Sequence, residues 1–297
     1  MKKAFTMLEL VFVIVIMGIV ASIGAEIIVK LYDNYLKTRS INKLQFQTEL
    51  VLDQIAKRLT YRIKDSTIGQ KKDGNFTELS NAGGDEYPIL AWIGKDNEGF
   101  KGGWNGTKVV PGWSGFVDLD SNETNATQIK TSGSHLSYAR GIINALSYGD
   151  INISTTAGPN AVLIFKGKDD YNVSKYGWNG SGTNDANYTY NIEEIGDELL
   201  KIKDKNITTA YEQYDLAWSA YALVPQPFNS DDFNLTLKYN FQPWDGEKYN
   251  EGKSSVLMEH VSTFRFIQIG ETIRIKLCIR DDKTGDGYGF CKEKVVF

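Results

Sequence analysis

The chain has 297 residues, of which 41% are hydrophobic, enough to bury the core of one large domain or two small ones. Lysine and arginine number 33 against 37 aspartates and glutamates, for a net charge of -4, so no basic excess favours nucleic acid as the main ligand. Two cysteines and two histidines, without C-x-x-C or H-x-x-x-H spacing, exclude the common zinc frameworks.

The first predicted element is a membrane-spanning helix. Lys2 and Lys3 precede an apolar run that reaches from Phe5 to Val29. At about 1.5 Å per residue, a helix of this length crosses the roughly 30 Å hydrocarbon layer. The positive-inside rule places the lysines in the cytoplasm, so the rest of the chain is expected on the other side of the membrane.

An acid interrupts this apolar run. Glu9 adds roughly 2.5–3.5 kcal/mol to the free energy of membrane insertion on translocon scales, so its presence calls for a function. A secretory signal peptide cut near Ala25 and a plain signal anchor are the alternatives. Neither of them has a use for a carboxylate in the apolar run.

The opening sequence KKAFTMLE, followed by the apolar run, resembles the N-terminal signal of type IV prepilins. The resemblance implies that a prepilin peptidase removes residues 1-4 by cutting between Ala4 and Phe5, and that it N-methylates Phe5. It also implies that Glu9 neutralises the amino terminus of a neighbouring subunit in a filament. Ala4 stands where the family usually has glycine, and the proline of many major pilins is missing, as it is in many pseudopilins.

The helix is predicted to continue beyond the membrane, with residues 5-29 as its spanning half and residues 30-66 as an amphipathic half. Apolar residues recur there at helical spacings, with one gap of six: Leu31, Tyr35, Ile41, Leu44, Val51, Ile55, Leu59 and Ile63. This pattern predicts a helix that packs on a domain core, and the pilin resemblance implies packing on a sheet. A regulatory stalk of two helices is the alternative.

From Thr67 the helical period ends, and residues 67-297 are predicted to form one β-rich head. The candidate strands are Ile89–Ile93, Val109–Val110, Phe116–Leu119, Ala161–Phe165, Leu216–Val224, Phe233–Phe241, Thr263–Ile269 and Thr272–Arg280. Residues 137–148 fit a helix or a strand equally, and long polar loops indicate insertions. The predicted fold class is α+β: a long N-terminal helix on an antiparallel, pilin-like head.

The segment 255–266, with the sequence SVLMEHVSTFRF, carries a second resemblance. It is similar to the late part of larger minor pseudopilins of the J or W type, in which a leucine-rich turn precedes a V-x-x-F-x-F strand. The resemblance covers about 30 further residues and implies a minor subunit.

Ten Asn-x-Ser/Thr sequons occur in the chain. Eight have an acid two residues before the asparagine, which resembles the acceptor sequence of bacterial oligosaccharyltransferases: Asn75, Asn122, Asn125, Asn152, Asn172, Asn187, Asn206 and Asn234. Asn105 and Asn179 lack the acid. A carboxylate offers a basic residue of an enzyme a charged contact, so we predict glycosylation at the eight and a periplasmic head; chance in acidic loops is the alternative.

Cys278 and Cys291 flank a turn-rich stretch and are predicted to be joined in a hairpin, which the periplasm permits; free thiols are the alternative. Alternation of Ile273, Ile275 and Leu277 puts Cys278 on the opposite, outer face. A calcium-loop pattern also runs through Asp282, Asp286 and Glu293, but strands flank it and Thr284 is a weak ligand. A plain Asp/Gly turn is therefore favoured, and no cofactor is predicted.

No catalytic motif is recognised, so the chain is predicted not to be an enzyme. The resemblance implies a minor pseudopilin of a type II secretion or type IV pilus-like machine, single-pass in the inner membrane with a periplasmic head. The implied partners are other pilins or pseudopilins, a prepilin peptidase, an inner-membrane platform protein, and a secreted substrate or DNA. The alternatives are a pseudopilin of competence DNA uptake and a membrane-anchored periplasmic binding protein.

Overall fold

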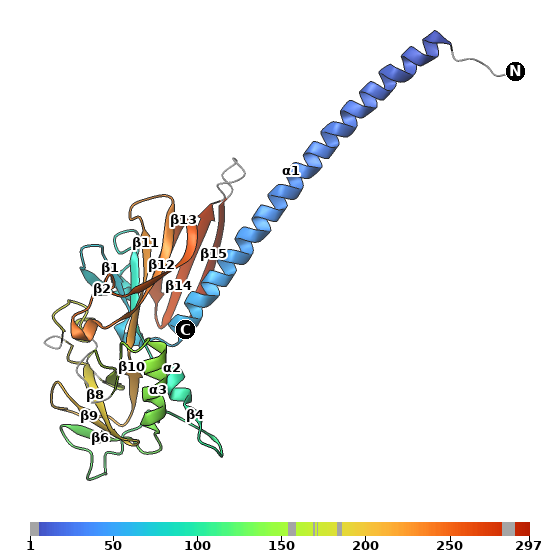
Figure 1. The fold of residues 1–297 in the computed structure, drawn as a ribbon. Helices are drawn as coiled ribbons and strands as arrows, with labels where there is room; N and C mark the ends of the chain where they lie inside the picture. The colour runs from blue at the N-terminus through green and yellow to red at the C-terminus, as the bar shows by residue number, and fades with distance from the viewer. Residues whose placement is uncertain (1–5, 154–158, 169, 171, 183–185, 281–288) are drawn as a thin grey trace.

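A computed structural model describes residues 6–153, 159–168, 170, 172–182, 186–280 and 289–297. Helix α1 (Met7–Thr60) is 54 residues long, which corresponds to about 80 Å. Figure 1 shows its N-terminal part projecting from the head and its C-terminal part lying against it. The architecture is thus a long apolar helix followed by an antiparallel β-rich head.

The head is built on a large antiparallel sheet. Within the described residues it has eight strands, in the order β15-β14-β13-β12-β11-β3-β1-β2. Their bounds are β1 (Ile68–Gln70), β2 (Phe76–Glu78), β3 (Ile89–Gly94), β11 (Ser219–Gln226), β12 (Phe233–Phe241), β13 (Lys253–Ile269), β14 (Thr272–Arg280) and β15 (Gly289–Val296). Short 3-10 helices flank these strands at Lys64–Ser66, Leu79–Asn81 and Pro243–Asp245.

The last turns of α1 cover one face of the large sheet. Leu52, Ile55 and Leu59 are fully buried there, in a cluster with side chains of β3 and β11 to β15. Burying an aliphatic side chain of this size contributes about 1.5–3 kcal/mol. Ion pairs from β15 to α1 flank the cluster, namely Lys292 with Glu49 at 3.0 Å and Lys294 with Asp53. The predicted packing of the amphipathic half on a sheet is confirmed for this part of the helix.

Residues 95–218 form an insertion between two neighbouring strands of the large sheet. β3 and β11 pair directly, with Gly94 opposite Ser219, so the chain leaves and re-enters at adjacent points. The inserted module contains α2 (Asn97–Lys101), β4 (Gly103–Trp104), β5 (Val109–Val110), β6 (Gln128–Lys130), α3 (Leu136–Leu146), β7 (Val162–Phe165), a 3-10 helix (Val173–Tyr176), β8 (Thr189–Gly196), β9 (Leu199–Ile202) and β10 (Tyr214–Ala217).

The module has its own core and also covers the second face of the large sheet. A smaller sheet, in the order β10-β7-β8-β9-β6, packs with α3 around a separate hydrophobic cluster. Another cluster joins alternate residues of β3, such as Ala91 and Ile93, to Val162 and Ile164 of β7. Successive strand residues point to opposite faces, so β3 is buried on both sides.

Several predicted elements differ from the structure. The helix ends at Thr60 rather than near residue 66, and the Ile63 amide donates to the Ile93 carbonyl, which joins the chain to the sheet. The predicted strand Phe116–Leu119 is wrong, since Phe116 makes only an isolated bridge to Gln213. The expected turn before the V-x-x-F-x-F segment lies within β13, at a register shift in its pairing with β12 between Met258 and Val261, where His260 has φ 57°.

Candidate functional site

The N-terminus of α1 is closed by a capping box. The Thr6 amide and hydroxyl donate to Glu9 Oε2 at 2.9 and 2.8 Å, and the Glu9 amide donates to Thr6 Oγ1 at 3.4 Å. A helix start leaves amide groups without partners inside the helix, and this arrangement satisfies some of them. The carboxylate of Glu9 is thereby held against the first turn of the helix.

Helix α1 is long and apolar enough near its N-terminus to cross a membrane, and no part of its most apolar window is buried by the residues that the structure describes. The apolar character also extends beyond a single span. Tyr32, Leu36, Phe46 and Leu50 are exposed and recur at spacings of four, ten and four, which place them on one side of a helix. We refer to these four residues as the outer stripe.

The outer stripe faces away from the sheet. The buried residues Val51, Ile55 and Leu59 lie on the side of α1 that packs on the head, whereas Phe46 is 67% exposed. Leu31, Tyr35 and Ile41 were predicted to belong to the packed face, but they are exposed as well. The N-terminal part of α1 projects away from the head (Figure 1). Beyond the span, α1 therefore presents apolar side chains that its own head does not cover.

A buried arginine anchors the end of α1. The Arg62 guanidinium donates to the carbonyls of Leu59, Phe297 and Glu271, at 2.7, 3.2 and 3.3 Å. Its planar fork can serve several acceptors at once, which a lysine ammonium does less well. The helix end, the β13–β14 turn and the end of β15 are fixed to one another through this side chain.

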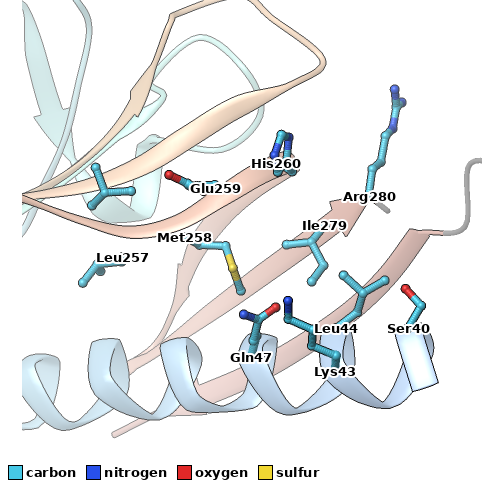
Figure 2. Close-up of a pocket in the computed structure, with 11 residues that line it drawn as sticks. Ser40, Lys43, Leu44, Gln47, Leu257, Met258, Glu259, His260, Ile279 and Arg280 are labelled. Carbon is cyan, nitrogen blue, oxygen red and sulfur yellow. The ribbon is translucent and has the colours of Figure 1, made fainter. Parts of the chain in front are cut away.

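A groove of about 470 Å³ opens where α1 diverges from the sheet. Figure 2 shows Lys43 and Gln47 of α1 on one side and Met258 of β13 and Ile279 of β14 on the other. Lys43 and Arg280 contribute positive charge to its lining, and Glu259 contributes negative charge. Within the part of the chain that the structure describes, no group of three or more His, Cys, Asp or Glu is placed to hold a metal ion.

The cysteine prediction is confirmed. Cys278 and Cys291 form a disulfide and lie opposite each other on β14 and β15, with their Cα atoms 4.0 Å apart. Ile275, Leu277 and Ile279 of β14 face the core, so the bridge lies on the outer face as the alternation predicted. Asp282 and Asp286 of the calcium pattern lie outside the described residues, and Glu293 pairs with Lys276 at 3.4 Å.

The other predicted site residues are dispersed. Ala4 and Phe5 lie outside the described residues. Six of the eight acidic sequons have exposed asparagines, namely Asn75, Asn122, Asn125, Asn172, Asn187 and Asn206. Asn152 and Asn234 are half-buried, and Asn234 lies within β12 opposite Gln226. At the first sequon, the Asn75 side-chain amide donates to Asp73 Oδ2 at 2.8 Å.

A buried acid in the inserted module was not anticipated from the sequence. Asp96 caps α2, accepting from the Gly99 amide at 3.0 Å and from Trp113 Nε1 at 3.1 Å. Burial raises the pKa of this carboxyl to about 7, although both hydrogen bonds favour its charged form. The sequence signal was the N-cap pattern of an aspartate before a short helix; the burial that shifts the pKa has no local signal.

Comparisons with known proteins give no assignment. No protein-family model matches the chain, and no significant match was found among curated proteins or solved structures.

Proposed function

We propose that this protein is a minor pseudopilin of a type II secretion or type IV pilus-like machine, with a cytoplasmic N-terminus and a periplasmic head. In this role α1 is both the membrane anchor and the surface by which subunits associate. A prepilin peptidase removes residues 1-4, an inner-membrane platform protein supports assembly, and the head meets secreted substrate or DNA. The role is structural rather than catalytic.

The outer stripe is the observation that carries this proposal. A simple anchor needs about 20 apolar residues, but exposed apolar side chains continue along α1 to Leu50. Exposed apolar patches mark interaction sites, and a helical stripe at these spacings fits another helix. The neighbouring subunits of a filament offer such helices along the whole length of α1.

Glu9 supports the same proposal. Its carboxylate accepts hydrogen bonds from Thr6 and lies four residues after the proposed new amino terminus at Phe5. A charge in an apolar bundle is retained only when it has a partner, and a neighbour's terminal amine is such a partner. The alternatives remain a competence pseudopilin, which shares this assembly, and a membrane-anchored binding protein, which does not need the outer stripe.

A double substitution in the outer stripe tests the proposal. Phe46→Ser with Leu50→Ser should leave head stability within about 0.5 kcal/mol, as for surface substitutions, because both side chains are exposed. Crosslinks between α1 and other pilin-like subunits in native membranes, captured by a photoreactive residue at Tyr35, should fall at least tenfold. Secretion or DNA uptake should fall with them.

The matched control is Asn42→Ser with Gln54→Ser, which changes exposed polar residues of the same helix. It should preserve both crosslinking and transport. Wild-type crosslinking in the Phe46/Leu50 variant would show that the outer stripe is not an assembly surface, and it would favour the anchored binding protein.

A further inference from the structure

The β4–β5 hairpin presents its apolar face to solvent. Trp104 and Val109 lie directly opposite each other, so their side chains share one face, and they are 63% and 66% exposed. The other cross-strand pair is Gly103 with Val110, and Val110 is buried. Strand alternation thus turns Val110 toward the module and leaves the indole of Trp104 and the side chain of Val109 exposed to solvent.

The hairpin is rigidly seated on the inserted module. A Cβ at Gly103 would lie 2.8 Å from Tyr138 Cδ1 of α3, and a Cβ at Gly102 would overlap the Val110 carbonyl oxygen. Tyr138 also donates to the Trp104 carbonyl at 3.3 Å. At the tip, Asn105 Oδ1 accepts from the amides of Thr107 and Lys108, at 3.0 and 2.9 Å. The exposed pair therefore stands on a preformed element.

The charged residues nearest to the pair in the sequence are lysines. Lys101 comes three residues before Trp104 and Lys108 directly precedes Val109, whereas the nearest acids are Glu98 and Asp118. Both lysines are exposed. Figure 1 shows this hairpin projecting from the lower part of the head, beside α2 and α3. The hairpin belongs to the inserted module, whereas the outer stripe lies on α1 and consists of uncharged residues.

We propose that the β4–β5 hairpin is a docking element for an acidic polypeptide surface that offers an apolar pocket to Trp104 and Val109. Tryptophan is among the residues that dominate interface energies when they enter a pocket. Lys101 and Lys108 complement acidic groups around that pocket and speed encounter at low salt. The hairpin would act in the same way on any anchored head, so the inference does not rest on filament assembly.

A polypeptide fits this element better than a glycan. Sugar recognition needs polar groups that fix the orientation of hydroxyls, and the side-chain oxygen of Asn105 already accepts two bonds within the turn. An exposed aliphatic side chain paired with the indole adds apolar area instead. Asn105 also belongs to a sequon without the preceding acid. Glycosylation that requires this acid would therefore not modify the hairpin.

The test uses the full-length protein in nanodiscs, with a random peptide phage library as the probe. Selection against the wild type should enrich peptides in which an aromatic or aliphatic residue is flanked by Asp or Glu. A synthetic peptide from that set should bind at least tenfold more weakly to Trp104→Ser with Val109→Ser. Lys101→Glu with Lys108→Glu should also weaken binding and reduce its dependence on salt.

Leu119→Ser, an exposed apolar residue of the same module, is the control and should bind the peptide like the wild type. Urea unfolding of each variant confirms that the head is folded, and the two lysine substitutions leave the packed hairpin untouched. Enrichment of basic peptides or of none, equal binding by the Trp104/Val109 variant, or binding of an oligosaccharide in place of peptides would each overturn the proposal.

Discussion

Glu9 carries a charge in an apolar helix and also caps that helix through Thr6. The T-x-x-E pattern that precedes an apolar run was readable as a capping box, so the local contact could have been predicted from the sequence. The proposed role of the charge could not, because that role would depend on a neighbouring subunit. A glutamine can keep the hydrogen bond from the Thr6 amide while removing the charge, and this separates the two roles.

Asp96 makes the stability of the inserted module dependent on pH. Its pKa is about 7 in the folded chain against 3.8 without burial, so between pH 4 and pH 7 the folded state binds a proton that the unfolded state releases. The free energy of unfolding should therefore fall as pH rises through this window. At about 1.4 kcal/mol per pKa unit, the free energy of unfolding falls by about 4 kcal/mol across this window. The substitution Asp96→Asn should remove this pH dependence.

Urea unfolding of the wild type and of Asp96→Asn at several pH values, followed by tryptophan fluorescence, measures this effect. The difference in stability between the two proteins should change steadily from pH 4 to pH 7 in favour of the variant. Asp120→Asn, which changes an exposed acid of the same module, serves as the control. If the stability of the wild type and of Asp96→Asn changed with pH in the same way, Asp96 would not be the source of the pH dependence.

At the scale of elements, strands with a clear apolar pattern were predictable. Phe233–Phe241 and Thr272–Arg280 coincide with β12 and β14, and the Ile89–Ile93 prediction lies within β3. The predicted strand Leu216–Val224 is two strands, β10 and β11, which belong to different sheets. No glycine or proline marks their boundary at Trp218, because the break comes from the chain crossing between sheets.

The loops carry a prediction about glycosylation. If modification follows folding, glycans should occupy the exposed acidic sequons Asn75, Asn122, Asn125, Asn172, Asn187 and Asn206. Asn234 should be modified little, because it is half-buried within a paired strand, and Asn105 and Asn179 should be modified little because they lack the acid. Glycopeptide mass spectrometry of protein from the native host measures each site. Equal occupancy of all ten sites, or of none, would refute the acid-reading interpretation.

At the scale of the whole molecule, the head separates into the large sheet that receives α1 and the module inserted between β3 and β11. The long polar loops indicated insertions, but they did not show that residues 95–218 enter and leave at paired positions. That pairing is a long-range contact, and no local pattern reports it. Under the proposed function, the large sheet and α1 serve assembly, and the module carries the exposed docking hairpin.

The charge of Glu9 is the most direct test of assembly through α1. Glu9→Gln, Glu9→Leu and Thr6→Val are expressed in the native background, and crosslinks to other pilin-like subunits are measured together with protein level. Both Glu9 variants should insert normally and lose at least tenfold in crosslinking, because a neighbour's amine is left unpaired in an apolar bundle. Thr6→Val loses a cap worth about 1 kcal/mol and should keep most crosslinks. Wild-type crosslinking by Glu9→Gln would contradict the account.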